Sequence, residues 1–231
     1  MVTHSKRYNA AFKKSADKIA HPLNEALGIL TQFPRAKFRE TVEVAFNLGI
    51  DPKQSDQNVR GTVSLPHGTG KKVRVVVFSK PGDVANAAKA AGAEEVGFDD
   101  LMQKVIGGWT DFDIAIATPE AMKEGVAKLG KVLGPRGLMP NPKTGTVTDD
   151  VVKAIKEVQA GRVEFKIDKG ANLHVPIGKV DFPMEQLVEN AQAVIDAVVK
   201  ARPPSAKGIY VKSCTLSATM SPGVRVIVKQ L

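Results

Sequence analysis

The chain carries two kinds of apolar pattern, and their order along the sequence constrains the fold more than any other feature. Residues 41–50, 59–65 and 163–177 alternate apolar with polar side chains. Such alternation is typical of strands with one buried face and one solvated face. Residues 73–78 and 114–117 are instead almost continuously apolar, as expected of parallel strands covered on both faces. The chain therefore predicts an α+β part formed by both ends and an α/β part between them.

Helical spacing of apolar residues accompanies both patterns. In the terminal parts it predicts helices within residues 6–33 and from Pro183 to about residue 201. In the middle part, short helices alternate with the apolar strands, which implies a small parallel sheet with right-handed crossovers. The strands at 41–50 and 59–65 are joined by a polar turn, and this favours an antiparallel pair.

Charge separates the same parts of the chain. Residues 68–159 contain 13 basic and 12 acidic residues, whereas the other 139 of the 231 residues contain 20 basic and 12 acidic ones. The run Pro66-His67-Gly68-Thr69-Gly70 interrupts the strand pattern and predicts a hinge. We therefore expect a discontinuous domain of residues 1–67 and 160–231, with an inserted domain of residues 68–159. The net charge of +9 favours a polyanionic partner, because each neutralised phosphate releases condensed counterions.

Groups suited to catalysis or metal binding are sparse. The single Cys214 cannot form an internal disulfide, and the four histidines are scattered. Residues 78–83 (Phe-Ser-Lys-Pro-Gly-Asp) lack the G-x-G-x-x-G pattern that brings helix N–H groups to a pyrophosphate. No apolar run approaches a membrane span, and no apolar signal segment follows the basic start. We expect a cytoplasmic, non-enzymatic protein without catalytic residues, metal, cofactor, small-molecule substrate or membrane contact.

A glycine- and proline-rich segment stands out at 129–146. It contains the cations Lys131, Arg136 and Lys143 and no acidic residue. Such composition is typical of a flexible surface loop. Prolines also hold cations in fixed positions, however, and Leu138 and Met139 require a surface to cover them. Both interpretations stay open at this point.

A second group of residues combines hydroxyls, cations and one aromatic ring at the ends of strands. It comprises residues 37–41 (Lys-Phe-Arg-Glu-Thr) and residues 215–225 near the C-terminus. Phenylalanine stacks on a base or ribose, while serine and threonine bind 2′-hydroxyls and phosphates. Phe38, however, has the parity of the inward residues of the following strand, so a core position explains it equally well.

Four sequence motifs carry a resemblance to a known family. They are L-G-K-V-L-G-P-R-G-L-M-P-N-P-K-T-G-T at 129–146, S-D-Q-N-V-R-G-T-V-S-L-P-H-G at 55–68, A-K-F-x-E-T-V-E-V at 36–44 and G-W-x-D-F-D at 108–113. With these motifs the chain closely resembles the bacterial type of the L-one family of ribosomal proteins, over essentially its whole length. The resemblance implies a discontinuous first domain and an inserted Rossmann-like second domain without a cofactor.

The resemblance also implies a function. It predicts a constituent of the mobile lateral stalk of the large ribosomal subunit that binds large-subunit ribosomal RNA and influences release of the exit-site tRNA. Many bacterial members also repress their own operon by binding a leader in its messenger RNA. Carried over by motif, the expected RNA-binding residues are Lys37, Phe38, Thr41, Ser213, Thr219, Met220, Gly223 and Arg225.

Two points qualify the resemblance. The family commonly has glycine after the Thr-Met pair, where this chain has Ser221, and a side chain there would crowd a close backbone approach. The segment with Lys131, Arg136 and Lys143 is expected either to contact RNA or to hold the two domains together. Two rival functions are a nucleotide-dependent enzyme using the α/β part and a basic DNA-binding protein.

Overall fold

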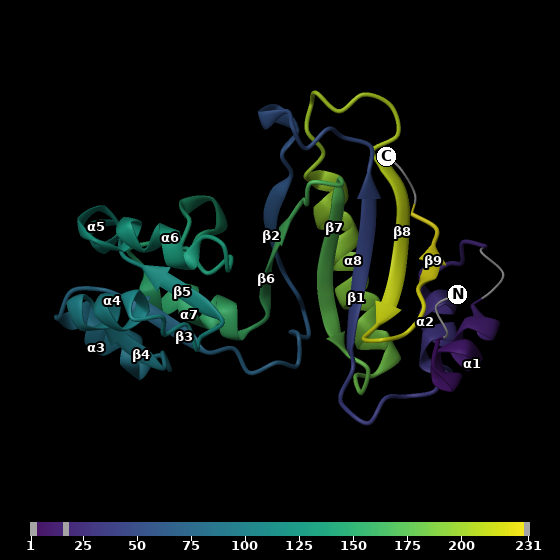
Figure 1. The fold of residues 1–231 in the computed structure, drawn as a ribbon, viewed down its shortest axis with the longest axis horizontal. Coiled ribbons are helices and arrows are strands. Elements are labelled where there is room, and N and C mark those ends of the chain that lie inside the picture. The colour runs from purple at the N-terminus through teal and green to yellow at the C-terminus, as the bar shows by residue number, and fades with distance from the viewer. Residues whose placement is uncertain (1–3, 16–18, 229–231) are drawn as a thin grey trace. The chain divides into compact units, whose positions relative to one another are not determined.

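A computed structural model describes residues 4–15 and 19–228. The chain divides into two compact units, which we call the first unit (residues 1–70 and 161–231) and the second unit (residues 71–160). Figure 1 shows that chain segments from both ends of the sequence build the first unit. Each unit is described by itself below.

A four-stranded antiparallel sheet forms the centre of the first unit, in the order β7-β1-β8-β9. The buried residues of β1 alternate strictly, as the sequence predicts, with Val42, Val44, Phe46 and Leu48 facing the core. The strands are β1 (Thr41–Leu48), β7 (Asn172–Lys179), β8 (Val211–Ala218) and β9 (Val224–Val226).

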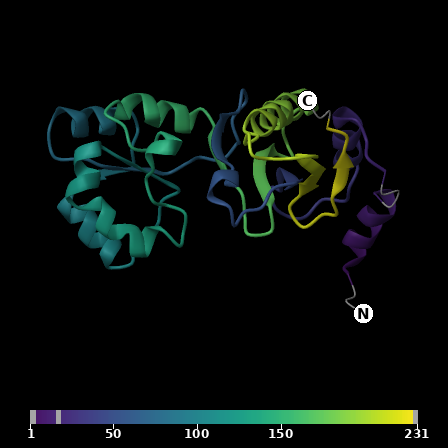
Figure 2. The same cartoon turned by 90° about the horizontal axis from the view of Figure 1, so that it is seen from above.

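Helices cover only one face of this sheet among the residues that the structure describes. In Figure 1 the helix α8 lies behind the strands, and Figure 2 shows the same arrangement from above. Leu187, Val194 and Val198 of α8 share one apolar core with the inward residues of β1. Within the first unit, no described helix packs on the opposite face. The helical elements of this unit are α1 (Lys6–Lys14), α2 (Leu23–Thr31), the 3₁₀ turn η1 (Ser55–Gln57) and α8 (Met184–Lys200).

The expected pairing of the first two strands is wrong. The strand β2 (Arg60–Ser64) pairs antiparallel with β6 (Arg162–Lys166) in a separate two-stranded sheet, while β1 lies between β7 and β8. Local alternation sets which face a strand buries, but both neighbours of β1 come from far along the chain. Tertiary packing of the apolar faces therefore overrides the short connection.

The chain leaves and re-enters the first unit at one point. A Cβ atom built on Gly161 would lie 2.3 Å from the Cα atom of Gly68, so these two backbones touch. Asn190, fully buried on α8, accepts from the His67 N–H at 3.1 Å and donates to the carbonyl oxygens of Gly68 and Ile177 at 3.0 and 2.7 Å. A buried amide with all these partners fixes the exit geometry.

The second unit is a three-layer α/β structure, as the continuous apolar strands predict. Its parallel sheet has the order β4-β3-β5. Figure 2 shows helices on both sides of this sheet. Ala88 of α3 and Ile155 of α7 pack on one face, whereas Leu101 of α4 and Leu133 of α6 pack on the other. The elements are β3 (Val75–Phe78), α3 (Asp83–Ala90), β4 (Glu95–Gly97), α4 (Asp99–Ile106), β5 (Ile114–Ala117), α5 (Pro119–Glu124), η2 (Val126–Leu129), α6 (Gly130–Leu133), η3 (Pro142–Thr144) and α7 (Val151–Gln159).

Candidate nucleic-acid interface

The open face of the four-stranded sheet is polar. We define this open face by the outward residues of its strands, which alternate with the buried ones. Hydroxyls and amides dominate it, and Glu43 is its one carboxylate, which accepts from the Ser217 hydroxyl at 3.2 Å. Its members are Thr41, Glu43, Ala45, Asn47, Asn172, His174, Pro176, Lys179, Ser213, Thr215, Ser217 and Arg225.

Thr41 and Thr219 join the start of β1 to the end of β8. The Thr41 N–H donates to the Thr219 hydroxyl at 3.0 Å, and the Thr219 N–H donates to the Thr41 carbonyl at the same distance. The Nζ atom of Lys179 donates to the Thr41 hydroxyl at 2.7 Å. These contacts bring a cation and two hydroxyls together at one end of the open face, and we call this the seam.

Beside the seam, a buried carboxylate organises the loop of residues 36–40. Glu40 is only 3% exposed, and its carboxylate accepts from the Ala36 N–H at 2.6 Å. Arg7 and Arg35 each approach the same carboxylate at 3.6 Å. A buried charge requires such partners, because an unpaired one carries a large desolvation cost. The loop is therefore held in one conformation before any ligand binds.

The loop presents Phe38 to solvent. The Phe38 side chain is 54% exposed, so the core alternative suggested by its strand parity is wrong. β1 begins only at Thr41, and the turn over residues 36–40 removes Phe38 from the alternation of the strand. Lys37 and Arg39 beside it are also exposed, and Arg39 pairs with Asp181 at 2.7 Å. A shallow hollow of about 400 Å³ lies among these side chains.

The turn after β8 places Met220 at the same end of the sheet. Met220 has a left-handed backbone (φ 62°) and a side chain that is 69% exposed. Ser221 turns its side chain back on the loop: its hydroxyl accepts from the Ala218 N–H at 3.0 Å and donates to the Ala218 carbonyl at 2.8 Å. The serine therefore closes the turn in place of a permissive glycine.

The other expected residues lie further along the open face. Arg225 is exposed on β9 opposite Thr215, and a Cβ atom on Gly223 would meet the Thr215 methyl group at 2.5 Å. Ser213 pairs with Asn47 near the opposite end of β8. The fold thus gathers Lys37, Phe38, Thr41, Thr219 and Met220 at the seam, but it does not bring Ser213 to them.

Sequence reasoning missed Lys179 and Arg7. Lys179 has the parity of the inward residues of β7, but the register with β1 shifts between Val42 and Glu43 and places Lys179 opposite Thr41. A bulge of this kind reverses which side a residue faces, and alternation alone cannot reveal it. The signal for Arg7 is only its basic surroundings at residues 6–14.

The segment at 129–146 lies within the second unit and contains α6 and η3. Leu138 and Met139 pack against the core of this unit, which is the covering surface that these two side chains require. The Ala117 N–H donates to the Thr146 carbonyl at 2.9 Å, which fastens the end of the segment to β5. Lys131 and Arg136 are exposed, and Arg136 donates to the Thr110 hydroxyl. The Lys143 side chain lies outside what the structure describes.

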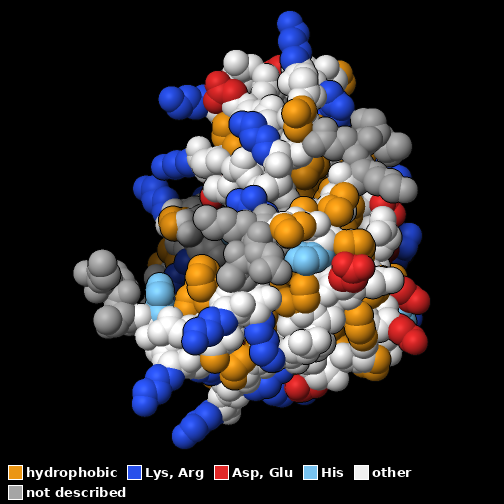
Figure 3. Space-filling model, turned by 90° about the vertical axis from the view of Figure 1, so that its right-hand side faces the viewer, with side chains coloured by type: hydrophobic (Ala, Val, Ile, Leu, Met, Phe, Trp, Pro, Cys, Tyr) orange, Lys and Arg blue, Asp and Glu red, His pale blue; other side chains and the backbone are white. Residues whose placement is uncertain are grey.

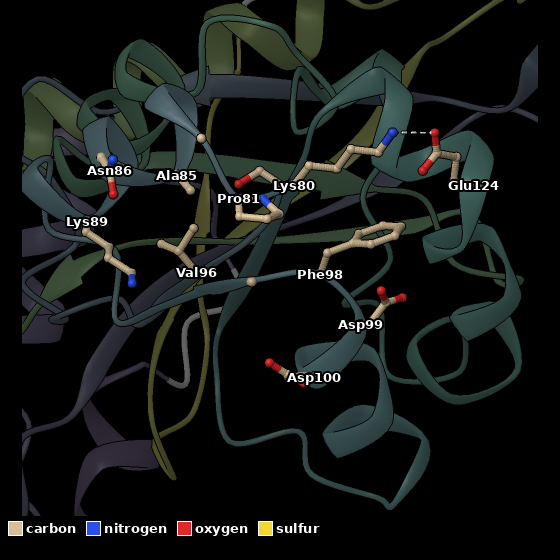
Figure 4. A pocket seen from close by; sticks show the side chains of 13 residues that line it. Lys80, Pro81, Ala85, Asn86, Lys89, Val96, Phe98, Asp99, Asp100 and Glu124 are labelled. Atoms are coloured by element: carbon tan, nitrogen blue, oxygen red, sulfur yellow. Dashed lines mark hydrogen bonds and ion pairs between the residues drawn. The ribbon is translucent and has the colours of Figure 1, made fainter.

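The α/β unit has a cavity of about 700 Å³ beyond the carboxyl ends of β3 and β4 (Figure 4). This is where related sheets bind phosphates at helix N-termini. Here Asp83 opens α3 and Asp99 and Asp100 open α4, while Lys80 is paired with Glu124 at 2.6 Å. Asp99, Asp100 and Glu124 line the cavity, and their carboxylates repel an anion, which disfavours the nucleotide-enzyme rival.

The described residues give little support to a nucleophilic thiol, a metal site or a membrane-spanning helix. Burial raises the pKa of the Cys214 thiol to about 12, so this thiol is a poor nucleophile. No three His, Cys, Asp or Glu side chains among the described residues are placed to share a metal ion. Within the same residues, no helix combines the length and apolarity of a membrane span.

The comparison with known families agrees with the motifs. The sequence model of the Ribosomal protein L1p/L10e family matches residues 30–222, which include β1, the whole second unit and the Met220 turn. Members of this family are cytoplasmic components of the large ribosomal subunit and bind its RNA. The match covers well over half of the chain. The protein therefore belongs to the Ribosomal protein L1p/L10e family of large-subunit ribosomal proteins.

Proposed function

We propose that the seam and the open face of the first unit bind large-subunit ribosomal RNA in the mobile lateral stalk. The observation that carries this proposal is the meeting of an exposed Phe38, an exposed Met220 and the Lys179–Thr41–Thr219 contacts at one end of an uncovered polar sheet face. The two units also differ in charge, because all but one of the nine excess positive charges lie in the first unit.

Each residue at the seam has a chemical role in this proposal. Phe38 stacks on an unpaired base, and Met220 covers an adjacent apolar surface. Lys37 at the seam and Arg225 further along the open face neutralise phosphates, while the threonine hydroxyls bind 2′-hydroxyls. Recognition then depends on the shape of a folded RNA, because the major groove of an RNA helix is too narrow for side chains. Ser213 and Gly223 serve the parts of the open face further from the seam.

We propose two further consequences of RNA binding. The protein helps to release the exit-site tRNA, and it represses translation of its own operon by binding a leader in the messenger RNA. One RNA-binding face serves both the ribosomal and the messenger site, so the two RNAs exclude one another. A competition experiment tests this: unlabelled ribosomal RNA fragment must displace the leader RNA from the protein. Formation of a ternary complex would contradict it.

The second unit offers another contact in this proposal. Lys131, Arg136 and Lys143 form a basic segment without an acidic residue between residues 129 and 146, and it contacts RNA or holds the two units together. Reversing the charge of Lys131 and Arg136 separates these roles. A loss of affinity at low salt supports RNA contact, whereas an altered interunit geometry in solution scattering, at unchanged affinity, supports the other role.

Salt dependence tests the phosphate contacts. The affinity of the full chain for a folded ribosomal RNA fragment is expected to fall with salt with a log–log slope of roughly −0.7 to −0.9 per neutralised phosphate. Filter binding or fluorescence anisotropy at several salt concentrations measures the slope. Duplex DNA of equal length is the competitor control, and it must compete poorly. An affinity that is insensitive to salt, or equal for duplex DNA, would contradict specific binding of folded RNA.

The left-handed backbone at Met220 leads to a second prediction, on the stability and RNA affinity of a glycine variant. Glycine adopts φ 62° without the steric cost that methionine bears. Met220→Gly is therefore expected to leave the free energy of unfolding unchanged or to raise it by up to about 1 kcal/mol, while the affinity for ribosomal RNA falls. Calorimetry and RNA titration on the same variant measure both. Met220→Leu, which keeps the apolar side chain, is the control and must bind better than Met220→Gly.

A further inference from the structure

The helix α1 presents an exposed surface that lies outside the residues matched by the family model and outside the seam. Its residues 6–14 precede the matched residues 30–222. Ala11 is its only buried residue. A helix of nine residues is marginal by itself in water, so its position depends on the contacts that hold it to the first unit.

Two of those contacts connect α1 directly to the proposed RNA-binding end. The Nη2 atom of Arg7 donates to the Met220 carbonyl at 2.8 Å, and the same guanidinium lies 3.6 Å from the buried Glu40 carboxylate. On the other side of Arg7, its Nη1 atom donates to the Pro34 carbonyl at 3.3 Å. The helix therefore continues the surface that begins at the Met220 turn and the 36–40 loop.

Three aromatic rings form a ladder along one flank of α1. The rings of His4 and Tyr8 stack with centroids 4.4 Å apart, and those of Tyr8 and Phe12 stack at 6.2 Å. Residues four apart lie on one side of a helix, so the ladder is continuous. Phe12 at its end is 50% exposed, and His4 is exposed as well.

The same helix is strongly basic. Its sequence K-R-Y-N-A-A-F-K-K contains four cations and no acidic residue. Lys6 and Lys13 are exposed on the side away from Arg7 and Ala11, and neither pairs with an acidic side chain among the described residues. Figure 3 views the end of the first unit that carries α1, and several Lys and Arg side chains lie at the lower left of this view, with hydrophobic side chains beside them.

Exposed rings beside exposed cations suit single-stranded nucleic acid, because bases stack on the rings while phosphates meet the cations. We propose that α1 is a second RNA-binding element, which takes unpaired nucleotides flanking the folded RNA held at the seam. Phe12 and Tyr8 stack on bases, and Lys6 and Lys13 neutralise phosphates. This inference rests on the proposed function of the seam and extends it to a neighbouring stretch of RNA.

Two RNA probes separate the two elements. One is a folded ribosomal RNA fragment trimmed to its paired core, and the other is the same fragment with single-stranded flanks. In the full-length protein, Phe12→Ala combined with Lys6→Gln and Lys13→Gln is expected to weaken binding of the flanked RNA by about tenfold. The log–log salt slope for that RNA should become shallower by about 0.7 for each phosphate lost. Binding of the trimmed RNA should stay unchanged.

Matched variants control for charge and for folding. Ile209→Ala with Lys200→Gln and Lys207→Gln removes one exposed apolar side chain and two exposed cations between the end of α8 and β8, and it must bind both RNAs like the unmodified protein. Phe12→Trp retains a stacking ring and must retain the preference for the flanked RNA, which a role in packing alone would not require. Equal loss on both RNAs, or no loss on either, overturns the role of α1. Failure of Phe38→Ala to weaken either RNA would instead overturn the proposed role of the seam.

Discussion

Replacing Phe38 by alanine is expected to weaken the binding of ribosomal RNA by about 1–3 kcal/mol, roughly 5- to 150-fold, while the melting temperature hardly changes. The Phe38 ring is 54% exposed, so its removal opens no large cavity. The loop that carries it is held by the Glu40 carboxylate and the Ala36 N–H, not by the ring. The loss therefore falls on binding. Calorimetry and anisotropy titration of one sample measure both quantities.

Phe46 on the following strand provides the matched control. It is 1% exposed in the core of the first unit, and Phe46→Ala is expected to lower the free energy of unfolding by about 3–5 kcal/mol. The folded fraction of this variant should keep its RNA affinity, since Phe46 faces away from the open face. A large drop in melting temperature for Phe38→Ala, with unchanged affinity of the folded fraction, would exclude stacking on RNA.

If the two units are separated, we expect the first unit to keep RNA binding and the second unit to lose it. We propose that residues 1–70 joined to 161–231 by a short glycine–serine linker form a domain that retains ribosomal RNA binding. The isolated residues 71–160 are expected to show none that can be measured. The charge difference motivates this: 20 basic against 12 acidic residues in the first unit, and 13 against 12 in the second.

The exit geometry explains why the joined ends are expected to fold. Gly68 and Gly161 are already in contact, and the Leu65 N–H donates to the Gly161 carbonyl at 3.2 Å, so a short linker closes the gap without strain. Asn190 holds the exit from within the same unit. Circular dichroism establishes folding of both parts before titration. RNA affinity in the isolated second unit, with none in the folded joined ends, would reverse the assignment.

Much of the local structure could be predicted because local rules determine it. Thr118 caps α5 through the Ala121 N–H at 3.3 Å, with Pro119 in the first turn, as those residue types predict. The continuous apolar runs at 75–78 and 114–117 form parallel strands. Long-range pairing was not predictable in this way. The partner of β1 is decided by which apolar faces pack on α8, not by the short turn toward β2.

The candidate interface was predictable in composition but not in detail. The motif at 36–44 contains Phe38, but its strand parity suggested a core position. That position is wrong because a turn, which depends on the buried Glu40, exposes the ring. The same motif contains Glu40, and nothing in the sequence indicates that Arg7 reaches it from 33 residues away. Lys179 could not be predicted, because a register shift turns it toward Thr41. The periodicity of the sequence does not reveal such a shift.

The strand order of the first unit also bears on the synthesis of the protein. The N-terminal strand β1 has its partners in residues 172–179 and 211–218, whereas β3 finds both of its partners by residue 117. Domains fold as units while the chain emerges from the ribosome. The second unit is therefore expected to fold first, although the chain begins with the first. A nascent chain lacks the Thr41–Thr219 contacts until its last strands are made, so the proposed RNA-binding seam is completed only late in synthesis.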